Sequence, residues 1–326
     1  MLQRVAIPVG KIEKLSVRGI VIKSTGSWYT VMTDNKKLCS CRLKGQFRIH
    51  GIRTTNPVAV GDHVEFKWEG EEENGIITAI EPRVNYIVRR SINLSKSAHI
   101  IASNIDRLYI VASIMLPRTS SGFIDRLLVT AEAYHIPAAL VFNKTDIYTD
   151  EAMDRCNELM SLYSSLGYPS YAVSALKGNG IDALREVLTD KVNLFSGHSG
   201  VGKSALINAI DPMLTLKTGE ISSYHSKGMH TTTFAEMHPL SFGGYMIDTP
   251  GIKEFGLVHF ESQEISERFP EFRALLPLCR YNNCTHNHEP GCAVKKARDE
   301  GNISAERYHN YLGLLNDENL DTTDYD

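Results

Sequence analysis

The order of four short motifs constrains this chain more than any other feature of its sequence. An Asn143-Lys144-Thr145-Asp146 stretch comes first, and a glycine-rich loop, Gly197-His198-Ser199-Gly200-Val201-Gly202-Lys203-Ser204, comes after it. Three threonines (231–233) and then Asp248-Thr249-Pro250-Gly251 follow that loop. In the usual domain built from such motifs, the glycine-rich loop opens the domain and the Asn-Lys-x-Asp stretch lies near its end. The order here therefore predicts a circularly permuted domain.

Each part of the glycine-rich loop meets a physical requirement of phosphate binding. Glycines let backbone N–H groups curl around phosphate oxygens, and the helix that begins near Lys203 directs its positive end at them. We expect Lys203 to reach the β- and γ-phosphates and Ser204 to ligate Mg²⁺. An apolar run (192–195) precedes the loop and a helical pattern (203–210) follows it, so a chance glycine-rich turn is the weaker interpretation.

The Asn-Lys-x-Asp stretch predicts that the base is guanine. The Asp146 carboxylate can accept hydrogen bonds from the N1–H and N2 amine of guanine, which adenine lacks. A mismatched base would leave that carboxylate unpaired, at a cost on the order of 1–3 kcal/mol or more. We expect Asn143 to contact the base edge and Lys144 to pack its methylenes on the ring. Ser174-Ala175-Leu176-Lys177 matches a supporting loop in which the Ala175 N–H faces guanine O6.

The last two motifs predict the catalytic end of the site. Asp248 is expected to hold Mg²⁺ through water, and the Gly251 N–H to touch the γ-phosphate. Thr232 is our candidate for closing over Mg²⁺, although three threonines also suit the start of a strand. Many GTPases orient the attacking water with a Gln after Asp-x-x-Gly, but this chain has Ile252 there. We therefore expect slow unassisted hydrolysis, with His230 positioning the water unless it is a solvent-facing loop histidine.

A cluster of cysteines near the C-terminus predicts a metal site. Cys279, Cys284, His286 and Cys292 offer three thiolates and one imidazole, a set typical of a closed structural zinc centre. His288 is a rival for His286. The odd number of clustered cysteines argues against a disulfide framework. We expect one structural zinc ion per chain, which supplies much of the folding free energy of this segment.

The N-terminal part predicts a small β-barrel that binds RNA. Five short alternating runs between residues 18 and 85 are separated by turn signals, as in an OB-fold. Residues 1–96 carry a net charge of +7 and the remainder −10, which favours a polyanionic partner for the barrel. The candidate RNA contacts are aromatic or basic, although each aromatic alone is more often a core residue: Trp28, Tyr29, Lys44, Phe47, Arg48, Arg53 and Phe66.

Length and composition divide the 326 residues into three expected domains. These are a barrel (1–95), a permuted GTPase domain with alternating strands and helices (96–260), and a helical zinc-binding domain (261–326). Residues 86–104 are expected to form a polar connector. The chain has no apolar run long enough to span a bilayer and no secretory signal, so we expect a cytoplasmic protein.

The motifs NKTD, SALKG, GHSGVGKS, HTTT, DTPG and CRYNNCTHNHEPGC together resemble the bacterial RsgA family (also YjeQ or YloQ), small-ribosomal-subunit-dependent GTPases. The resemblance covers nearly the whole chain. It implies an OB-fold that docks on 16S rRNA, hydrolysis of GTP to GDP stimulated by the 30S subunit, and a role in late 30S maturation. Met229 departs from the basic residue that often precedes the family's switch histidine, so a phosphate contact from that position is not implied.

Two other functions fit the same motifs. An RNA-binding scaffold could use the nucleotide only to rigidify itself, and a permuted GTPase could act on the large (50S) subunit instead. Turnover of GTP with each purified subunit separates these possibilities. We expect the chain to be a monomer whose partners are GTP or GDP, the 30S subunit and 16S rRNA, without DNA or membrane partners.

Overall fold

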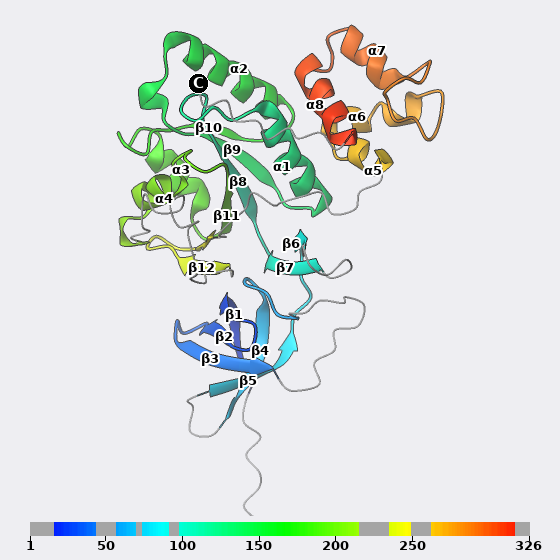
Figure 1. Cartoon of the computed structure of the whole chain (residues 1–326). Helices are drawn as coiled ribbons and strands as arrows, with labels where there is room; N and C mark the ends of the chain where they lie inside the picture. Colours follow the sequence, from blue (N-terminus) through cyan, green and yellow to red (C-terminus); the bar gives the residue numbers. More distant parts are fainter. Residues whose placement is uncertain are drawn as a thin grey trace, which may run out of the picture.

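The computed structural model describes residues 16–43, 57–69, 74–90, 98–214, 235–248 and 262–316. Figure 1 shows a β-barrel at the bottom, a sheet flanked by helices above it, and a small helical unit beside that sheet. No helix in the described ranges has the length and apolar character needed to cross a membrane.

The barrel is built from five short strands, and buried side chains alternate with more exposed ones along the third, fourth and fifth of them. They are β1 (Val17–Ser24), β2 (Tyr29–Thr33), β3 (Leu38–Leu43), β4 (His63–Glu69) and β5 (Asn74–Ile80). Pairing runs from β1 through β2, β3 and β5 to β4, and β4 returns to β1 and closes the barrel. Strands β3 and β5 are parallel, whereas the other neighbours are antiparallel. The predicted OB-like barrel is confirmed.

Most of the described aromatic candidates of the barrel are core residues. Tyr29 is 1% exposed and Phe66 is fully buried, and both belong to the cluster that fills the barrel. Trp28 is 43% exposed and is the described aromatic candidate that remains on the surface. Phe47 and the basic candidates Lys44, Arg48 and Arg53 lie outside the described residues.

The expected polar connector at residues 86–104 is instead a β-hairpin. Strands β6 (Tyr86–Arg90) and β7 (Ala98–Ser103) pair antiparallel. Ile87 and Ala102 are buried in the largest core cluster, and Val88 and Ile100 are buried in a separate small cluster with Ala59, so both faces of the hairpin contact apolar side chains. Arg89 and Arg90 are the last two residues of β6, and these charged side chains gave the segment the polar composition that predicted a connector.

The central sheet of the core consists of parallel strands with one antiparallel edge strand. In chain order they are β8 (Arg107–Ala112), β9 (Ala138–Phe142), β10 (Ser170–Ala172), β11 (Val192–Ser196), β12 (Glu236–Pro239) and β13 (Tyr245–Asp248). Their order in the sheet is β10-β9-β8-β11-β13-β12, and β12 is the antiparallel member. The central strands β8 and β9 are continuous buried apolar runs, as expected where helices cover both faces of a sheet.

Two pairs of helices cover the two faces of this sheet. Helices α1 (Ser121–Ala133) and α2 (Asp150–Ser165) pack on the face of the sheet that carries Leu108 and Ile110. Helices α3 (Ile181–Leu188) and α4 (Lys203–Ile210) pack on the opposite face, which carries Tyr109 and Val111. Short 3-10 turns, η1 (Thr145–Ile147) and η2 (Pro212–Leu214), follow β9 and α4. Successive side chains of β8 point to opposite faces, so this strand contributes to the apolar core on each side of the sheet.

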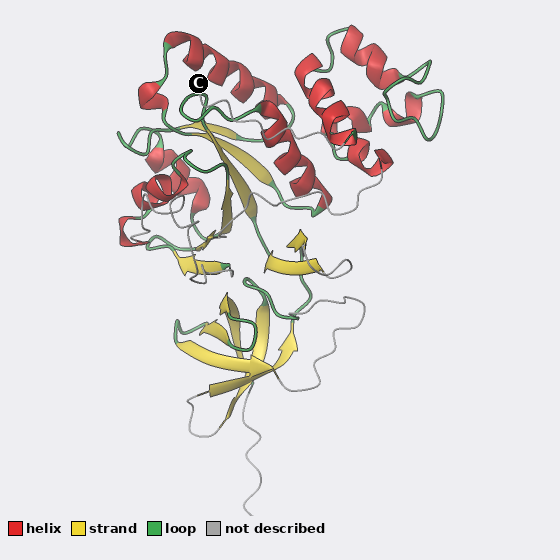
Figure 2. Ribbon diagram, in the orientation of Figure 1, coloured by secondary structure: helices red, strands yellow, loops and turns green. Residues whose placement is uncertain are grey.

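The C-terminal unit is made of short helices, as Figure 2 shows. They are α5 (Ser262–Glu267), α6 (Pro270–Arg273), η4 (Leu276–Leu278), α7 (Ala293–Asp299) and α8 (Ala305–Leu315). Its core contains Phe269, Phe272 and Tyr311, whose rings contact one another at centroid distances of 5.0 to 5.4 Å. The predicted helical segment around the cysteines is confirmed.

Candidate functional site

The motif-bearing loops meet at one edge of the core sheet. Asn143 directly follows β9, Ser174 lies just beyond β10, and Gly197 directly follows β11. Because these strands are parallel, their carboxyl ends lie at the same edge, which is where open α/β sheets bind ligands. The structure therefore brings together stretches that are far apart in the sequence.

Two glycines of the phosphate loop are required by close contacts. Gly197 has φ +156°, and a Cβ atom there would lie 2.3 Å from the Val111 carbonyl oxygen of β8. Gly202 has φ +90°, and its Cβ would lie 2.6 Å from Nδ2 of Asn143. The Lys203 ammonium lies within the curve of the loop and donates to the carbonyl oxygens of Gly197 (2.5 Å) and His198 (2.7 Å). The loop is thus held close to the base-reading stretch.

Asn143 joins the phosphate loop to the supporting loop after β10. Its side chain is buried, its Nδ2 donates to the Val201 carbonyl oxygen at 2.9 Å, and its Oδ1 accepts from the Ala175 N–H at 3.1 Å. Tyr148 Oη donates to the Asn143 carbonyl oxygen at 2.7 Å. Both polar groups of the Asn143 amide therefore hold loops in register, and its contact with a base edge stays a prediction.

Asp146 and Lys144 lie on the open side of these loops. The Asp146 carboxylate is exposed, and its Oδ1 accepts a hydrogen bond from Ser174 Oγ at 2.5 Å. The Ser174 hydroxyl also accepts from the Lys177 N–H at 3.0 Å. Lys144 has a left-handed backbone (φ 69°), and burial lowers the pKa of its ammonium while nearby Asp146 opposes that shift. The contact with Ser174 aims the Asp146 carboxylate.

One loop of the site was missed by sequence reasoning. Residues 113–120 follow β8 at the same edge, and the Leu116 carbonyl oxygen accepts a hydrogen bond from Lys144 Nζ. The Pro117 ring lies 3.3 Å from where a Cβ of Gly200 would be. Leu116 is 62% exposed beside Lys144. The available signal was its position directly after an apolar strand, because such positions face the ligand edge.

A ring stack joins the phosphate loop to helix α1. The His198 and Phe123 rings stack with centroids 3.5 Å apart and planes at 29°, and both side chains are buried. The helix begins there because Ser120 Oγ accepts from the Phe123 N–H at 3.1 Å, which caps its first turn. The start of α1 is thereby fixed against the loop.

The remaining predicted residues of this site belong to the phosphate loop, to the end of β13 and to segments outside the described residues. Ser199 and Ser204 lie in the loop and at the start of α4, next to Lys203. Asp248 ends β13, and its backbone pairs with that of Glu236 in β12. The predictions for His230, Thr232 and Gly251 fall outside the described residues.

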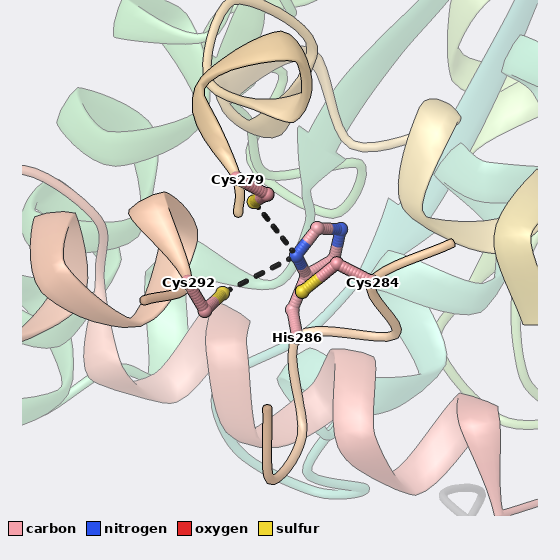
Figure 3. A group of neighbouring side chains, drawn as sticks. All are labelled: Cys279, Cys284, His286 and Cys292. Atoms are coloured by element: carbon pink, nitrogen blue, oxygen red, sulfur yellow. Dashed lines mark hydrogen bonds between the residues drawn. The ribbon is translucent and has the colours of Figure 1, made fainter. Parts of the chain in front are cut away.

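The predicted metal ligands converge in the C-terminal unit, as Figure 3 shows. The ligand atoms of Cys279, Cys284, His286 and Cys292 all lie within 4.8 Å of one another. Nδ1 of His286 is 3.6 Å from Cys279 Sγ and 3.4 Å from Cys292 Sγ. A tetrahedral zinc centre with ordinary bond lengths places a nitrogen ligand about 3.5 Å from each sulfur. The donor set and its spacing fit a zinc ion.

Hydrogen bonds hold the loop that carries these ligands. Glu289 Oε1 accepts from both the N–H and the hydroxyl of Thr285 at 2.7 Å, and Oε2 accepts from the Asn287 N–H at 3.1 Å. Burial alone would raise the pKa of Glu289, but these bonds outweigh it and lower the pKa to about 2. Burial raises the pKa of the Cys284 thiol to about 12, so this thiolate needs a cation nearby to form.

Comparison with known proteins agrees with this architecture. The family model described as the RsgA N-terminal domain matches residues 18–77, and the RsgA GTPase model matches residues 80–258. The curated "Small ribosomal subunit biogenesis GTPase RsgA" of Bacteroides fragilis is 54% identical over 301 residues, covering 92% of this chain and 97% of that protein. The chain belongs to the RsgA GTPase family.

Other RsgA proteins and solved structures extend the match. The RsgA of Christiangramia forsetii is 51% identical and covers 93% of this chain and 96% of its own. YjeQ from Thermotoga maritima superposes with a TM-score of 0.76 at 33% identity, covering 93% and 98%. YloQ, described as a circularly permuted GTPase, gives 0.73 at 27% identity, covering 94% and 96%. The permuted fold and the GTP hydrolase class are therefore confirmed.

Proposed function

We propose that this RsgA-family chain binds the 30S ribosomal subunit and hydrolyses GTP to GDP and phosphate during late maturation of that subunit. The supporting observation is the meeting of the phosphate loop with the Asn143–Asp146 stretch, through the Asn143–Val201 hydrogen bond at 2.9 Å. The printed names of the relatives, small ribosomal subunit biogenesis GTPases, supply the process. The proposal includes stimulation of turnover by the subunit.

In this proposal the loops divide the nucleotide among them. Asp146, aimed by Ser174, accepts from guanine, and the Lys144 stem and the Ala175 N–H complete the base pocket. The N–H groups of the phosphate loop (197–202) and the Lys203 ammonium hold the phosphates at the start of α4. Mg²⁺ bound with GTP would neutralise phosphate charge, and Ser204, Thr232 and Asp248 would hold it. His230 positions the attacking water.

The proposal gives each of the three domains its own role. The barrel (1–95) docks on 16S rRNA, the permuted domain (96–260) turns over GTP, and the C-terminal domain (261–326) binds one structural zinc ion at Cys279, Cys284, His286 and Cys292. A closed set of four protein ligands leaves no open position for catalysis. The chain acts as a monomer in the cytoplasm, where ribosomal subunits mature, without DNA or membrane partners.

Subunit-dependent turnover tests this function. The purified chain is incubated with GTP and Mg²⁺ alone, with 30S particles, or with 50S particles, and released phosphate is measured. We expect unassisted turnover on the order of 10⁻⁴–10⁻² s⁻¹ and a clear increase with 30S particles only. Equal turnover in all three samples contradicts the proposal, and an increase with 50S alone points to the large subunit.

Base selection tests the site itself. Asp146→Asn should weaken GDP binding on the order of tenfold or more and favour xanthosine diphosphate, because the amide presents a donor to the base edge. Asp150→Asn removes an exposed carboxylate in the first turn of α2 and is the matched control. Unchanged guanine selectivity in Asp146→Asn removes this residue from base recognition.

A further inference from the structure

Helix α8 holds a buried arginine between two carboxylates from different parts of the chain. Arg307 Nη1 donates to Oδ1 of Asp125, on helix α1 of the core, at 2.5 Å. Its Nε and Nη2 donate to the two oxygens of Glu271, on α6, at 2.8 and 3.0 Å. The side chains of Arg307 and Asp125 are 2% and 0% exposed. Burial alone would lower the pKa of Arg307, but Asp125 and Glu271 outweigh it and hold the pKa well above its usual value.

Asp125 is the point where α1, α2 and α8 meet. Besides Arg307, its carboxylate accepts from Asn310 Nδ2 at 2.7 Å and from the Tyr163 hydroxyl at 2.8 Å. Asn310 also reaches Ser121 Oγ, at the first residue of α1, at 3.1 Å. A buried carboxylate with three donors defines the position of its helix, because any displacement leaves the charge partly unpaired.

The next residues of α8 contact the metal-ligand loop. Tyr308 Oη donates to the carbonyl oxygen of His286, and Tyr311 Oη donates to that of Thr285, both at 2.6 Å. Residues three or four apart share a helix face, so α8 presents Arg307 and Asn310 to α1 while Tyr308 and Tyr311 hold the loop. In Figure 1, α8 stands next to α1. The folding of the metal-ligand loop and the docking of α8 on α1 are therefore physically connected.

The other end of this connection is the phosphate loop. Phe123, in the same first turns of α1 as Asp125, stacks on His198 at 3.5 Å. Contacts run without a gap from the His286 carbonyl through Tyr308 and Arg307 to Asp125, and from Phe123 to His198. The metal-ligand loop is thus attached to α8 and the phosphate loop to α1, and the contacts of Asp125 join these two helices.

We propose that Arg307 and Asn310 are positioning residues for the nucleotide site. By holding Asp125 they fix α1, and through Phe123 they fix His198 in the phosphate loop, so that docking of the metal-loaded C-terminal domain raises nucleotide affinity. The two states are α8 docked or undocked. By reciprocity, nucleotide binding then favours the docked state. This inference rests on the proposed function, because it deepens the role of the same nucleotide site.

A cycle of one substitution and metal removal tests this coupling. The dissociation constant of Mg²⁺·GDP is measured by calorimetry for the full chain and for Arg307→Met, each zinc-loaded and after chelation. We expect about tenfold weaker binding in the loaded variant, within the usual range of coupling between sites. Chelation should weaken the parent by a similar factor and have little further effect on Arg307→Met, because both changes release the same contact.

A matched control separates this contact from domain docking in general. Arg155 of α2 forms a partly exposed ion pair with Glu306 of α8 at 2.6 Å, so Arg155→Gln weakens another contact of α8 while leaving Asp125 and its three donors in place. Its GDP affinity should stay within about twofold of the parent, and its response to chelation should be retained. If Arg307→Met does not fold, Asn310→Ala removes one donor to Asp125 and should give a smaller loss in the same direction.

The outcomes are distinguishable. The coupling is overturned if the GDP dissociation constants are equal in all samples while hydrogen exchange shows that α8 is undocked in Arg307→Met. That result would leave the assignment of the nucleotide site intact. If chelation and Arg307→Met each weaken GDP binding and their factors multiply, the two changes act independently, and the route from the metal site through Arg307 is overturned. Absence of GDP binding by the parent chain contradicts the proposed function itself.

Discussion

The core joins its two neighbours by contacts of different kinds. Toward the barrel, β1 pairs with β12 at the single position Lys23↔Glu236, and the two side chains form an ion pair at 3.1 Å, 41% and 37% exposed. Toward the C-terminal unit, Arg307 and Asp125 form an ion pair that is almost wholly buried. The Tyr245 hydroxyl of the core also donates a hydrogen bond to Sδ of Met32 in the barrel at 3.7 Å.

This difference determines how each joint responds to a single substitution. An exposed ion pair contributes about 0–1 kcal/mol and is screened by salt, and strand pairing uses backbone groups that every non-proline residue has. Removing one partner of a buried pair costs about 3–5 kcal/mol, because the other charge stays buried and unpaired. The exposed Lys23–Glu236 pair should therefore tolerate substitution, whereas the buried Arg307–Asp125 pair should not.

Metal removal should have the largest effect of all, and its effect on folding should be confined to the C-terminal domain. Structural zinc contributes on the order of 10 kcal/mol of apparent binding free energy to small domains. Chelation should release one zinc ion per chain and abolish hydrogen-exchange protection in α7 and α8, while the barrel and the β8–β11 strands keep theirs. Retained protection of α7 and α8 without metal would show that the apolar core around Phe272 suffices.

Removing the buried arginine should have the next largest effect. Arg307→Met should lower the free energy of unfolding of the C-terminal domain by about 3–5 kcal/mol in urea titrations. Adding Asp125→Leu should recover only part of the loss, because the Glu271 carboxylate, which is 9% exposed, still lacks its partner. Arg155→Gln, at the partly exposed pair with Glu306, should lose less than about 1 kcal/mol. Equal losses in Arg307→Met and Arg155→Gln would refute the distinction between the two kinds of pair.

Substitution in the exposed Lys23–Glu236 ion pair between barrel and core should have the smallest effect. Lys23→Glu should lower the free energy of unfolding by about 1 kcal/mol or less in low salt, and by less still in 0.5 M salt. Glu236→Lys in the same chain should restore the attraction with reversed charges. A loss as large as that of Arg307→Met would show that this exposed ion pair contributes as much as the buried one.

Much of this architecture was predictable from local patterns, and the rest depends on distant contacts. The strands Ala138–Phe142 and the helix Lys203–Ile210 follow from apolar runs and the glycine-rich loop, and the residue types of the metal cluster predict its ligands. The hairpin of β6 and β7 was missed because Arg89 and Arg90, within β6, gave the segment a polar composition. Asp125 and Arg307 lie 182 residues apart, and no sequence period relates them.

The same limit applies within the nucleotide site. Motifs identified Asn143 and Gly202, but the reason for glycine there is the approach of the Asn143 amide, which appears only when β9 and β11 are placed in one sheet. Leu116 and Phe123 belong to no motif, and they reach the site because β8 ends beside it.

The central claim is that two stretches in permuted order form one guanine-nucleotide site. Calorimetric titration of the purified, zinc-loaded chain with Mg²⁺·GDP and, separately, Mg²⁺·ADP tests it most directly. The account predicts one GDP bound per chain and no measurable ADP binding. Absence of GDP binding, or equal affinity for both nucleotides, would contradict it.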